Sequence, residues 1–332
     1  MGNRRIQLSD PALRALIRPT LCVFAALLLG ACATIAQPPP RGSWSFAVFG
    51  DTPYNQTAEA LLTPVIDQIN REDLAFVVHV GDIKSGGEPC SDELFERRKR
   101  LLARIRHPLI VLPGDNEWTD CRRPRAGGHD PLERLEALRR LFHAGDTSLG
   151  ERPMRLERQS DLDARHPEYR EHVRWSAKGI VFAGVNVPGH NNNIAVEAEY
   201  RRRTAAVLDW LDEAAALAAR PEAGALVIAM QANPFFWNRF PRLPGTPDGL
   251  AALREKLLQI VTRLGKPVLL VHGDTHSYTV DHPLADPQTG VPMERFIRLE
   301  VFGSPTVNWI RVTPLAGGAG GFWIQPARPE SP

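Results

Sequence analysis

The chain has 332 residues, of which 43% are hydrophobic and 23% are charged, a balance typical of a soluble globular protein. This length suits one large α/β domain or two modest ones. The formal net charge is only +2, which argues against a protein that binds nucleic acid through its overall charge, so we expect no nucleic-acid partner.

Residues 1–32 are predicted to be an export signal. Several arginines precede an apolar stretch at residues 21–33, which is too short to span a bilayer as a helix. The Leu-Gly-Ala-Cys sequence at residues 29–32 resembles the lipobox of bacterial lipoproteins, in which the cysteine becomes the lipidated first residue of the mature chain. We favour lipidation of Cys32 over an ordinary cleaved signal. We therefore expect an exported protein of a bacterial cell envelope, either periplasmic or anchored to a membrane through this lipid alone.

The mature part divides into a Pro-rich tether at residues 33–43, a domain at 44–326 and a short tail at 327–332. Inside the domain, short apolar runs typical of buried strands alternate with longer segments whose apolar residues recur at helical spacing. Strands are predicted at residues 44–49, 74–80, 108–112, 179–187, 225–232, 267–272, 296–301, 308–313 and 321–325. Helices are predicted at residues 57–70, 91–104, 131–142, 197–218 and 249–264.

This alternation predicts parallel strands joined by helical crossovers. The last three strands have short connections, so we expect them to close a second sheet that is partly antiparallel. Residues 116–171 are rich in Arg, Asp, Gly and Pro, and are predicted to form a cap-like insertion over one end of the sheet. The expected fold is α/β, a two-sheet β-sandwich flanked by helices.

Two cysteines, Cys90 and Cys121, lie in the mature domain. Export implies an oxidising compartment, so we expect these two to form a disulfide. The bond would close a loop of about 30 residues and stabilise the fold by a few kcal/mol. No neighbouring Cys-x-x-Cys or Cys/His cluster points to a metal role for them.

Several predicted strands end in glycine followed at once by aspartate. These aspartates are Asp51, Asp82, Asp115 and Asp274. In α/β sheets, ligands bind outside the carboxyl ends of the strands, where carboxylates that meet repel one another unless a cation neutralises them. One such aspartate is usually a turn or helix cap. Four of them, with Gln231 at another strand end and His276 beside the last, predict a metal centre.

These motifs resemble those of the calcineurin-like metallophosphoesterase family, which run Asp-x-His, Gly-Asp, Gly-Asn-His-Asp/Glu, a lone His and Gly-His-x-His. The resemblance covers about residues 45–280. It implies a metallo-dependent phosphatase-like fold and two divalent metal ions. It also implies that a metal-activated water attacks a phosphate ester.

The first three motifs are only partly kept. Asp51 and Asp82 match ligands of the family, and Asp82 would bridge the two metals, but Pro53 stands where the first motif has histidine. In the third motif Asp115 replaces a ligand asparagine, and Asn116 replaces the acid–base histidine. A shift of the alignment by one residue would make Asn116 the ligand instead.

The later motifs also exchange nitrogen for oxygen. Gln231 stands in place of the lone histidine, Asp274 replaces the first histidine of the last motif, and His276 keeps the second. The resemblance implies a first metal held by Asp51, Asp82 and His276. A second would be held by Asp82, Asp115, Asp274 and Gln231. Oxygen-rich sites favour Mn²⁺ or Mg²⁺, with Ca²⁺ and Fe as further options, over Zn²⁺.

Asn116 has no proton to give at neutral pH, so the family's leaving-group acid is missing. We expect His190, in a polar loop after a strand, to replace it; the alternative is a solvent-exposed loop residue. Substrate contacts are expected from Lys84, Asn116, Arg123 and Asn191. The predicted function is hydrolysis of a small-molecule phosphate ester. The alternative is a non-catalytic family member that binds metal or a phosphorylated ligand.

Overall fold

The computed structural model describes residues 42–236 and 244–328, which fall within one compact unit at Pro39–Pro332. The predicted export signal and Cys32 lie outside the described residues, as do most of the tether and the end of the tail. In the described part of the chain, no helix has both the length and the apolar character that crossing a membrane requires.

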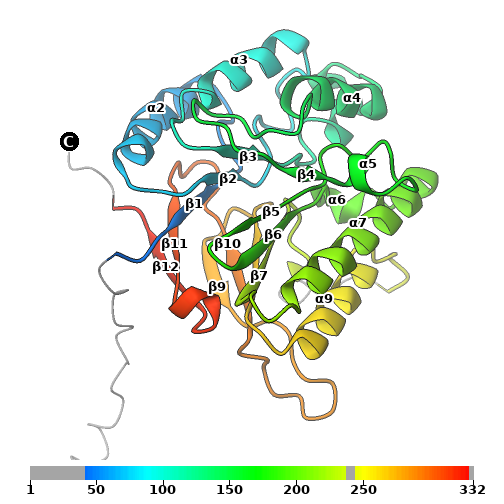
Figure 1. Cartoon of the computed structure of the whole chain (residues 1–332). Coiled ribbons are helices and arrows are strands. Elements are labelled where there is room, and N and C mark those ends of the chain that lie inside the picture. Colours follow the sequence, from blue (N-terminus) through cyan, green and yellow to red (C-terminus); the bar gives the residue numbers. More distant parts are fainter. Residues whose placement is uncertain (1–41, 237–243, 329–332) are drawn as a thin grey trace, which may run out of the picture. The chain divides into compact units, whose positions relative to one another are not determined.

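Two β-sheets stack face to face (Figure 1). The five-stranded sheet has the order β12-β11-β1-β2-β3, in which β1, β2 and β3 are parallel and β11 and β12 are antiparallel additions. Its strands are β1 (Phe46–Phe49), β2 (Val77–His79), β3 (Leu109–Val111), β11 (Ile310–Pro314) and β12 (Phe322–Pro326).

The seven-stranded sheet has the order β4-β5-β6-β7-β8-β10-β9, with β6, β7, β8 and β10 parallel and antiparallel strands at both edges. Its strands are β4 (Glu157–Arg158), β5 (Val173–Ala177), β6 (Ile180–Gly184), β7 (Ala225–Ala229), β8 (Val268–His272), β9 (Thr279–Asp281) and β10 (Phe296–Glu300). The predicted two-sheet α/β fold is confirmed.

Helices cover the outer face of each sheet (Figure 1). On the five-stranded sheet they are α2 (Gln56–Arg71), α3 (Asp92–Leu102) and α4 (Pro131–Phe142). On the seven-stranded sheet they are α7 (Glu197–Ala218) and α9 (Ala251–Leu264). Short helical turns are η2 (Thr119–Arg122), η3 (Pro124–Ala126), α5 (Gln159–Leu162), α6 (Gly189–Asn192) and η4 (Ala316–Gly318).

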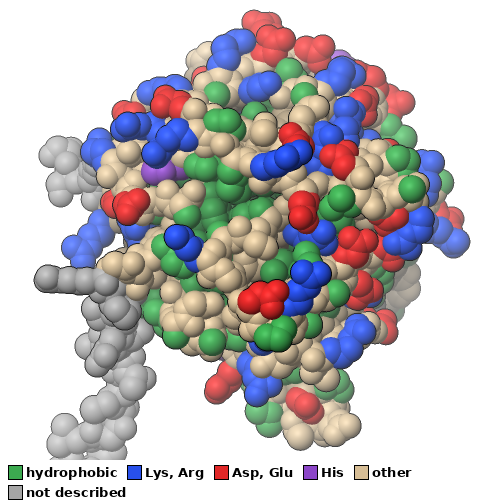
Figure 2. All heavy atoms as spheres, in the orientation of Figure 1, with side chains coloured by type: hydrophobic (Ala, Val, Ile, Leu, Met, Phe, Trp, Pro, Cys, Tyr) green, Lys and Arg blue, Asp and Glu red, His purple; other side chains and the backbone are tan. Residues whose placement is uncertain are grey.

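Strand alternation explains why both faces of β1 are buried. Phe46 and Val48 point into the core between the two sheets, whereas Ala47 and Phe49 point outward beneath the helices. The helices on the five-stranded sheet begin at side-chain caps, as at Asn55, whose Oδ1 accepts from the backbone N–H of Ala58 at 2.8 Å. Charged side chains spread over these helices, whereas apolar ones gather near the middle of the face in Figure 2.

The expectation for the last three strands is only partly right. β11 and β12 form an antiparallel pair, but β10 joins the other sheet, parallel to β8. The strands β5 and β9 were not predicted. In β5, Arg174 interrupts the apolar pattern, yet its guanidinium lies 4.3 Å from the centre of the Trp210 ring, so it packs against α7 without being apolar.

The segment 116–171 holds α4, which packs beside α3 and shares the apolar cluster on the outer face of the five-stranded sheet. A cap-like role for this segment stays a prediction. Its last residue, Glu171, is buried and accepts hydrogen bonds from the Arg139 guanidinium at 2.8 and 2.7 Å. Burial opposes ionisation, but the charge of Arg139 outweighs it and lowers the pKa of Glu171 to about 2.

We expect Glu171→Gln to lower the free energy of unfolding at pH 7 by about 3–5 kcal/mol, because Arg139 loses its buried counter-charge and keeps only Glu136, at 3.7 Å and partly exposed. The folded pKa of Glu171 lies below its unfolded value of about 4.3, so this contribution is complete above that pH and is lost as the pH falls toward about 2. Urea unfolding at several pH values measures it. Glu96→Gln, at an exposed pair with Arg100, should cost less than about 1 kcal/mol; equal losses would contradict the prediction.

Candidate metal centre

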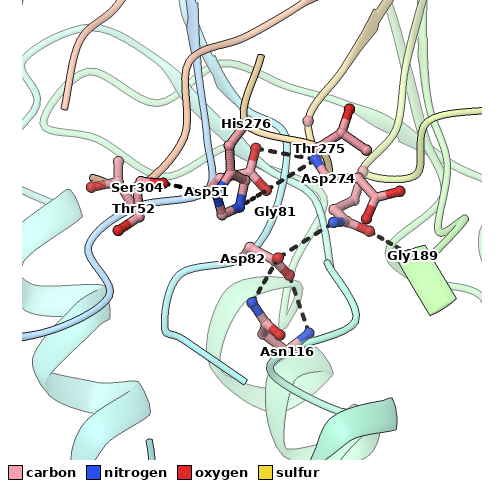
Figure 3. Close-up of polar contacts among 12 residues, drawn as sticks. Asp51, Thr52, Gly81, Asp82, Asn116, Gly189, Asp274, Thr275, His276 and Ser304 are labelled. Atoms are coloured by element: carbon pink, nitrogen blue, oxygen red, sulfur yellow. Dashed lines mark hydrogen bonds and ion pairs between the residues drawn. The ribbon is translucent and has the colours of Figure 1, made fainter. Parts of the chain in front are cut away.

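Loops from both sheets meet at the candidate site. Asp51, Asp82 and Asp115 follow the parallel strands β1, β2 and β3, and Gln231 and Asp274 follow β7 and β8 of the other sheet. Figure 3 shows Asp51, Asp82, Asp274 and His276 gathered around one space. The predicted convergence of strand ends is therefore present, and it occurs where the two sheets adjoin.

Asp51 and His276 form one side of the site. The carboxylate oxygens of Asp51 accept from the backbone N–H of Asp274 at 3.0 and 3.2 Å. Nε2 of His276 lies 3.7 Å from Oδ1 of Asp51, and its Nδ1 lies 2.9 Å from the carbonyl oxygen of Ser304. A carbonyl oxygen only accepts, so Nδ1 carries the proton and Nε2 presents a lone pair to the site. This is the arrangement that suits a metal-binding histidine.

Asp82 lies at the centre of the polar contacts. Its Oδ2 accepts from the side-chain nitrogens of Asn116 at 2.7 Å and Gln231 at 3.3 Å, and from the hydroxyl of Tyr54 at 2.8 Å. Its Oδ1 accepts from the backbone N–H of Asn116 at 3.1 Å. The carboxylate thus contacts three separate loops; its role as the ligand that bridges two metals stays a prediction.

The carboxylates are buried together and disturb one another. Burial, reinforced by the charges of neighbouring carboxylates, raises the pKa of Asp51 and Asp82 well above the usual aspartate range. Burial and the charge of Asp115 raise the pKa of Asp274 to about 7. A bound divalent cation would remove this mutual repulsion, so the donor set fits a metal ion.

Backbone strain is concentrated at these residues. Left-handed φ angles occur at Asp51 (49°), Asp82 (59°), Asp274 (78°) and His276 (57°). Such conformations cost side-chain-bearing residues about 1–3 kcal/mol each and persist where the surrounding structure enforces them. Here they turn each side chain from the end of its strand back toward the shared space.

Two of the glycines that precede these aspartates leave room for a carboxylate. A Cβ atom at Gly273 would lie 2.0 Å from Oδ2 of Asp51, and one at Gly114 would lie 2.1 Å from Oδ1 of Asp82. The Gly-Asp pattern therefore supplies a carboxylate and also makes room for the carboxylate of a neighbouring loop.

A second group of ligand atoms borders the site. Asp115, Asp120 and His190 each offer an atom within 4.8 Å of the others. Nδ1 of His190 lies 3.4 Å from Oδ2 of Asp115. Nε2 of His190 accepts a hydrogen bond from Nη2 of Arg123 at 2.9 Å. Asp120 is buried and pairs with Arg123 through Oδ2, while its Oδ1 has no partner. Burial and the Asp115 charge raise the pKa of Asp120 to about 6.

His190 begins a left-handed turn. Residues 190–193 have φ angles of 51°, 57°, 57° and 54°, and the last three are asparagines, which tolerate this conformation better than most residues. The buried guanidinium of Arg203 holds the turn by donating to the side chain of Asn192 at 2.5 Å and to its carbonyl at 3.0 Å. The half-exposed imidazole of His190 therefore stands on a rigid support at the rim of the site.

A second set of contacts lies behind the loops that carry Asp82 and Asp115. Oε1 of Glu117 accepts from the backbone N–H of Gly114 at 2.6 Å and of Asp82 at 3.1 Å. Burial raises the pKa of Glu117 to about 7. The predicted disulfide between Cys90 and Cys121 is present, with 5.7 Å between Cα atoms, and ties the same two loops together.

Several predicted residues have contacts that limit the predicted roles. Lys84 is fully buried, and its ammonium donates to the carbonyls of Ser85 at 2.8 Å and Asn116 at 2.7 Å. The amide of Asn191 contacts the loop at residues 247–249. The oxygen of Gln231 accepts from Gly189, so its nitrogen faces Asp82. The substrate role of Lys84 and Asn191 and the ligand role of Gln231 stay predictions that these contacts do not support.

Asp115 and Asn116 both stay candidates for the ligand of the third motif. The carboxylate of Asp115 and that of Asp274 both approach Gly189, so Asp115 lies among the carboxylates. The amide of Asn116 is directed at Asp82 instead.

Tyr54, Glu117 and Asp120 belong to the site although they were not predicted. Each lies within five residues of a predicted site residue, which was the available signal.

The chain matches one family model and is similar to solved structures. The family model described as calcineurin-like phosphoesterase matches residues 45–278. Among solved structures, the chain is similar to PhoD, with 12% identity and a TM-score of 0.52 over 87% of this chain and 70% of that one. Vacuolar protein sorting 29 from Cryptosporidium parvum shares 12% identity at a TM-score of 0.31, over 87% of this chain and 94% of that one. Curated proteins gave no match.

We expect Gly273→Ala to lower the free energy of unfolding by about 1–3 kcal/mol, because the added methyl group displaces the Asp51 carboxylate. Gly145→Ala is the matched control: its added Cβ meets no atom within 4 Å, and the change should stay within about 0.5 kcal/mol. Urea unfolding of both variants measures the difference. A Gly273→Ala protein as stable as the control would show that Asp51 is not packed against this loop.

Proposed function

Because the chain belongs to the calcineurin-like phosphoesterase family, we propose that it hydrolyses a phosphate ester of a small molecule with the help of two divalent metal ions. The observation that carries the proposal is the convergence of buried carboxylates from both sheets around His276, whose Nε2 presents a lone pair to the site. A set of like charges this close is costly unless cations bind there.

The first metal would be held by Asp51, Asp82 and His276, and the second by Asp82, Asp115 and Asp274, with Gln231 beside it. When bound, the ions would supply Lewis-acid stabilisation of the phosphoryl oxygens and a water of lowered pKa. The donors are mostly carboxylate oxygens, which favours Mn²⁺ or Mg²⁺ over Zn²⁺.

His190 would donate the proton that the leaving group needs. Its imidazole is half exposed, so a bound ester could reach it, and its hydrogen bond with Asp115 raises its pKa. Nε2 accepts from Arg123 in this structure, so Arg123 would have to turn away when Nε2 takes up the proton that it delivers. Arg123, partly exposed and beside His190, could also contact the phosphate. Asn116 can help only by hydrogen bonding, since its amide is directed at Asp82.

The second candidate function is metal or ligand binding without turnover. Pro53 supplies no ligand where the family has histidine, and Asn116 supplies no proton. The buried carboxylates suit a bound metal in both candidates, and the half-exposed His190 and Arg123 at the rim favour the enzyme. Export, with Cys32 as the lipidated residue, is proposed from the sequence; the disulfide between Cys90 and Cys121 suits an oxidising compartment.

We expect metal-dependent hydrolysis of p-nitrophenyl phosphate or its bis-ester after reconstitution with Mn²⁺, Mg²⁺, Ca²⁺, Fe²⁺ or Zn²⁺. Asp82→Asn should abolish it, because the residue that bridges both metals loses its charge. Asp67→Asn, at an exposed surface position, should leave it unchanged. Metal binding without turnover would favour the second candidate, and neither binding nor turnover with any ion would refute both.

If His190 donates the leaving-group proton, His190→Asn should lower kcat about 10²- to 10⁴-fold for an alkyl phosphate. The loss should be much smaller for p-nitrophenyl phosphate, whose leaving group needs no protonation. Steady-state kinetics on the two esters provide an internal control. Equal losses on both would instead indicate that His190 only shapes the site.

A further inference from the structure

Tyr54 occupies a position at the site that none of the motifs accounts for. It follows Pro53 directly, and its ring packs edge-on against His276, with 5.3 Å between ring centres. Its hydroxyl oxygen lies 2.8 Å from Oδ2 of Asp82, 3.1 Å from Nε2 of His276 and 3.1 Å from Nδ2 of Asn116.

The Tyr54 hydroxyl lies among side-chain atoms that accept hydrogen bonds. Nδ1 of His276 donates to Ser304, so Nε2 can only accept, and the carboxylate of Asp82 accepts as well. The Tyr54 hydroxyl has one proton for these two acceptors. Oδ1 of Asp51, 3.7 Å from the same Nε2, adds another acceptor. Amide groups satisfy part of this set, since Asn116 and Gln231 donate to Asp82 and the backbone N–H of Asp274 donates to Asp51. Lone pairs from four residues nevertheless face one space, an arrangement that suits a cation site.

The spacing also fits a coordination sphere. Ligand atoms about 2.0–2.2 Å from a metal ion and at right angles to each other are about 3 Å apart. The hydroxyl oxygen of Tyr54 already lies at such distances from Asp82 and His276, both assigned to the first metal. A phenolate is an anionic oxygen donor, so it extends the oxygen-rich chemistry of the site.

We propose that the oxygen of Tyr54 is a ligand of the first metal and supplies the donor that Pro53 cannot. This inference rests on the proposed metal site. On binding, the O–H bond breaks, the oxygen keeps the electron pair and binds the ion, and the proton passes to solvent. A tyrosine that only positions Asp82 would keep its proton.

The test is calorimetric titration of the purified protein with Mn²⁺, together with ultraviolet difference spectra. In the wild-type protein we expect two bound ions and the appearance of a tyrosinate band. Tyr54→Phe should weaken the binding of one ion by at least about tenfold and remove the band. Tyr278→Phe is the matched control, because Tyr278 stacks on Phe302 at the edge of the larger sheet; it should keep both properties.

The outcomes separate this inference from the proposed function. Wild-type protein that binds Mn²⁺ without a tyrosinate band, or Tyr54→Phe that binds both ions as tightly as wild type, would overturn the ligand role alone. Wild-type protein that binds no Mn²⁺ would overturn the metal site as well. The spectrum of the wild-type protein decides even if the variant is unstable.

Discussion

Mutual repulsion among buried carboxylates is the constraint around which the site is organised. Asp51, Asp82 and Asp274 lie close together where little water reaches them, so each raises the cost of ionising the others. Backbone N–H groups offset part of this cost, as the amide of Asp274 does for Asp51. The remaining cost is what a bound cation would relieve.

The fold holds this arrangement in place from behind. Parallel strands of two sheets deliver the carboxylates to one edge, and left-handed residues turn the side chains inward. The disulfide, the buried carboxylate of Glu117 and the buried ammonium of Lys84 all fasten the loops after β2 and β3. Arg203 does the same for the turn that carries His190. Groups that would face a substrate are therefore supported by buried contacts rather than by mobile loops.

On the proposed function, neighbouring groups in the fold would replace those that the family motifs have lost. Pro53 removes a ligand, and the next residue, Tyr54, places an oxygen among the remaining ligand atoms. Asn116 removes a proton donor, and His190 approaches the site from a loop of the other sheet. The chemistry of a site depends on where the polar end of each side chain lies in space, and not on its position in a motif. A site can therefore keep its chemistry while its motifs diverge.

The sequence by itself determined the strand-helix alternation, the Gly-Asp strand ends and the pairing of Cys90 with Cys121. The alternation follows from local periodicity, the strand ends from adjacent residues, and the disulfide from the small number of cysteines in the mature chain. The tertiary structure alone decided that β10 joins the larger sheet, that Lys84 is buried, and that Tyr54, Glu117 and Asp120 belong to the site. The physical reason is that periodicity reports which face of an element is buried. The distance between side chains on different loops depends on how the two sheets stack, which no local pattern encodes.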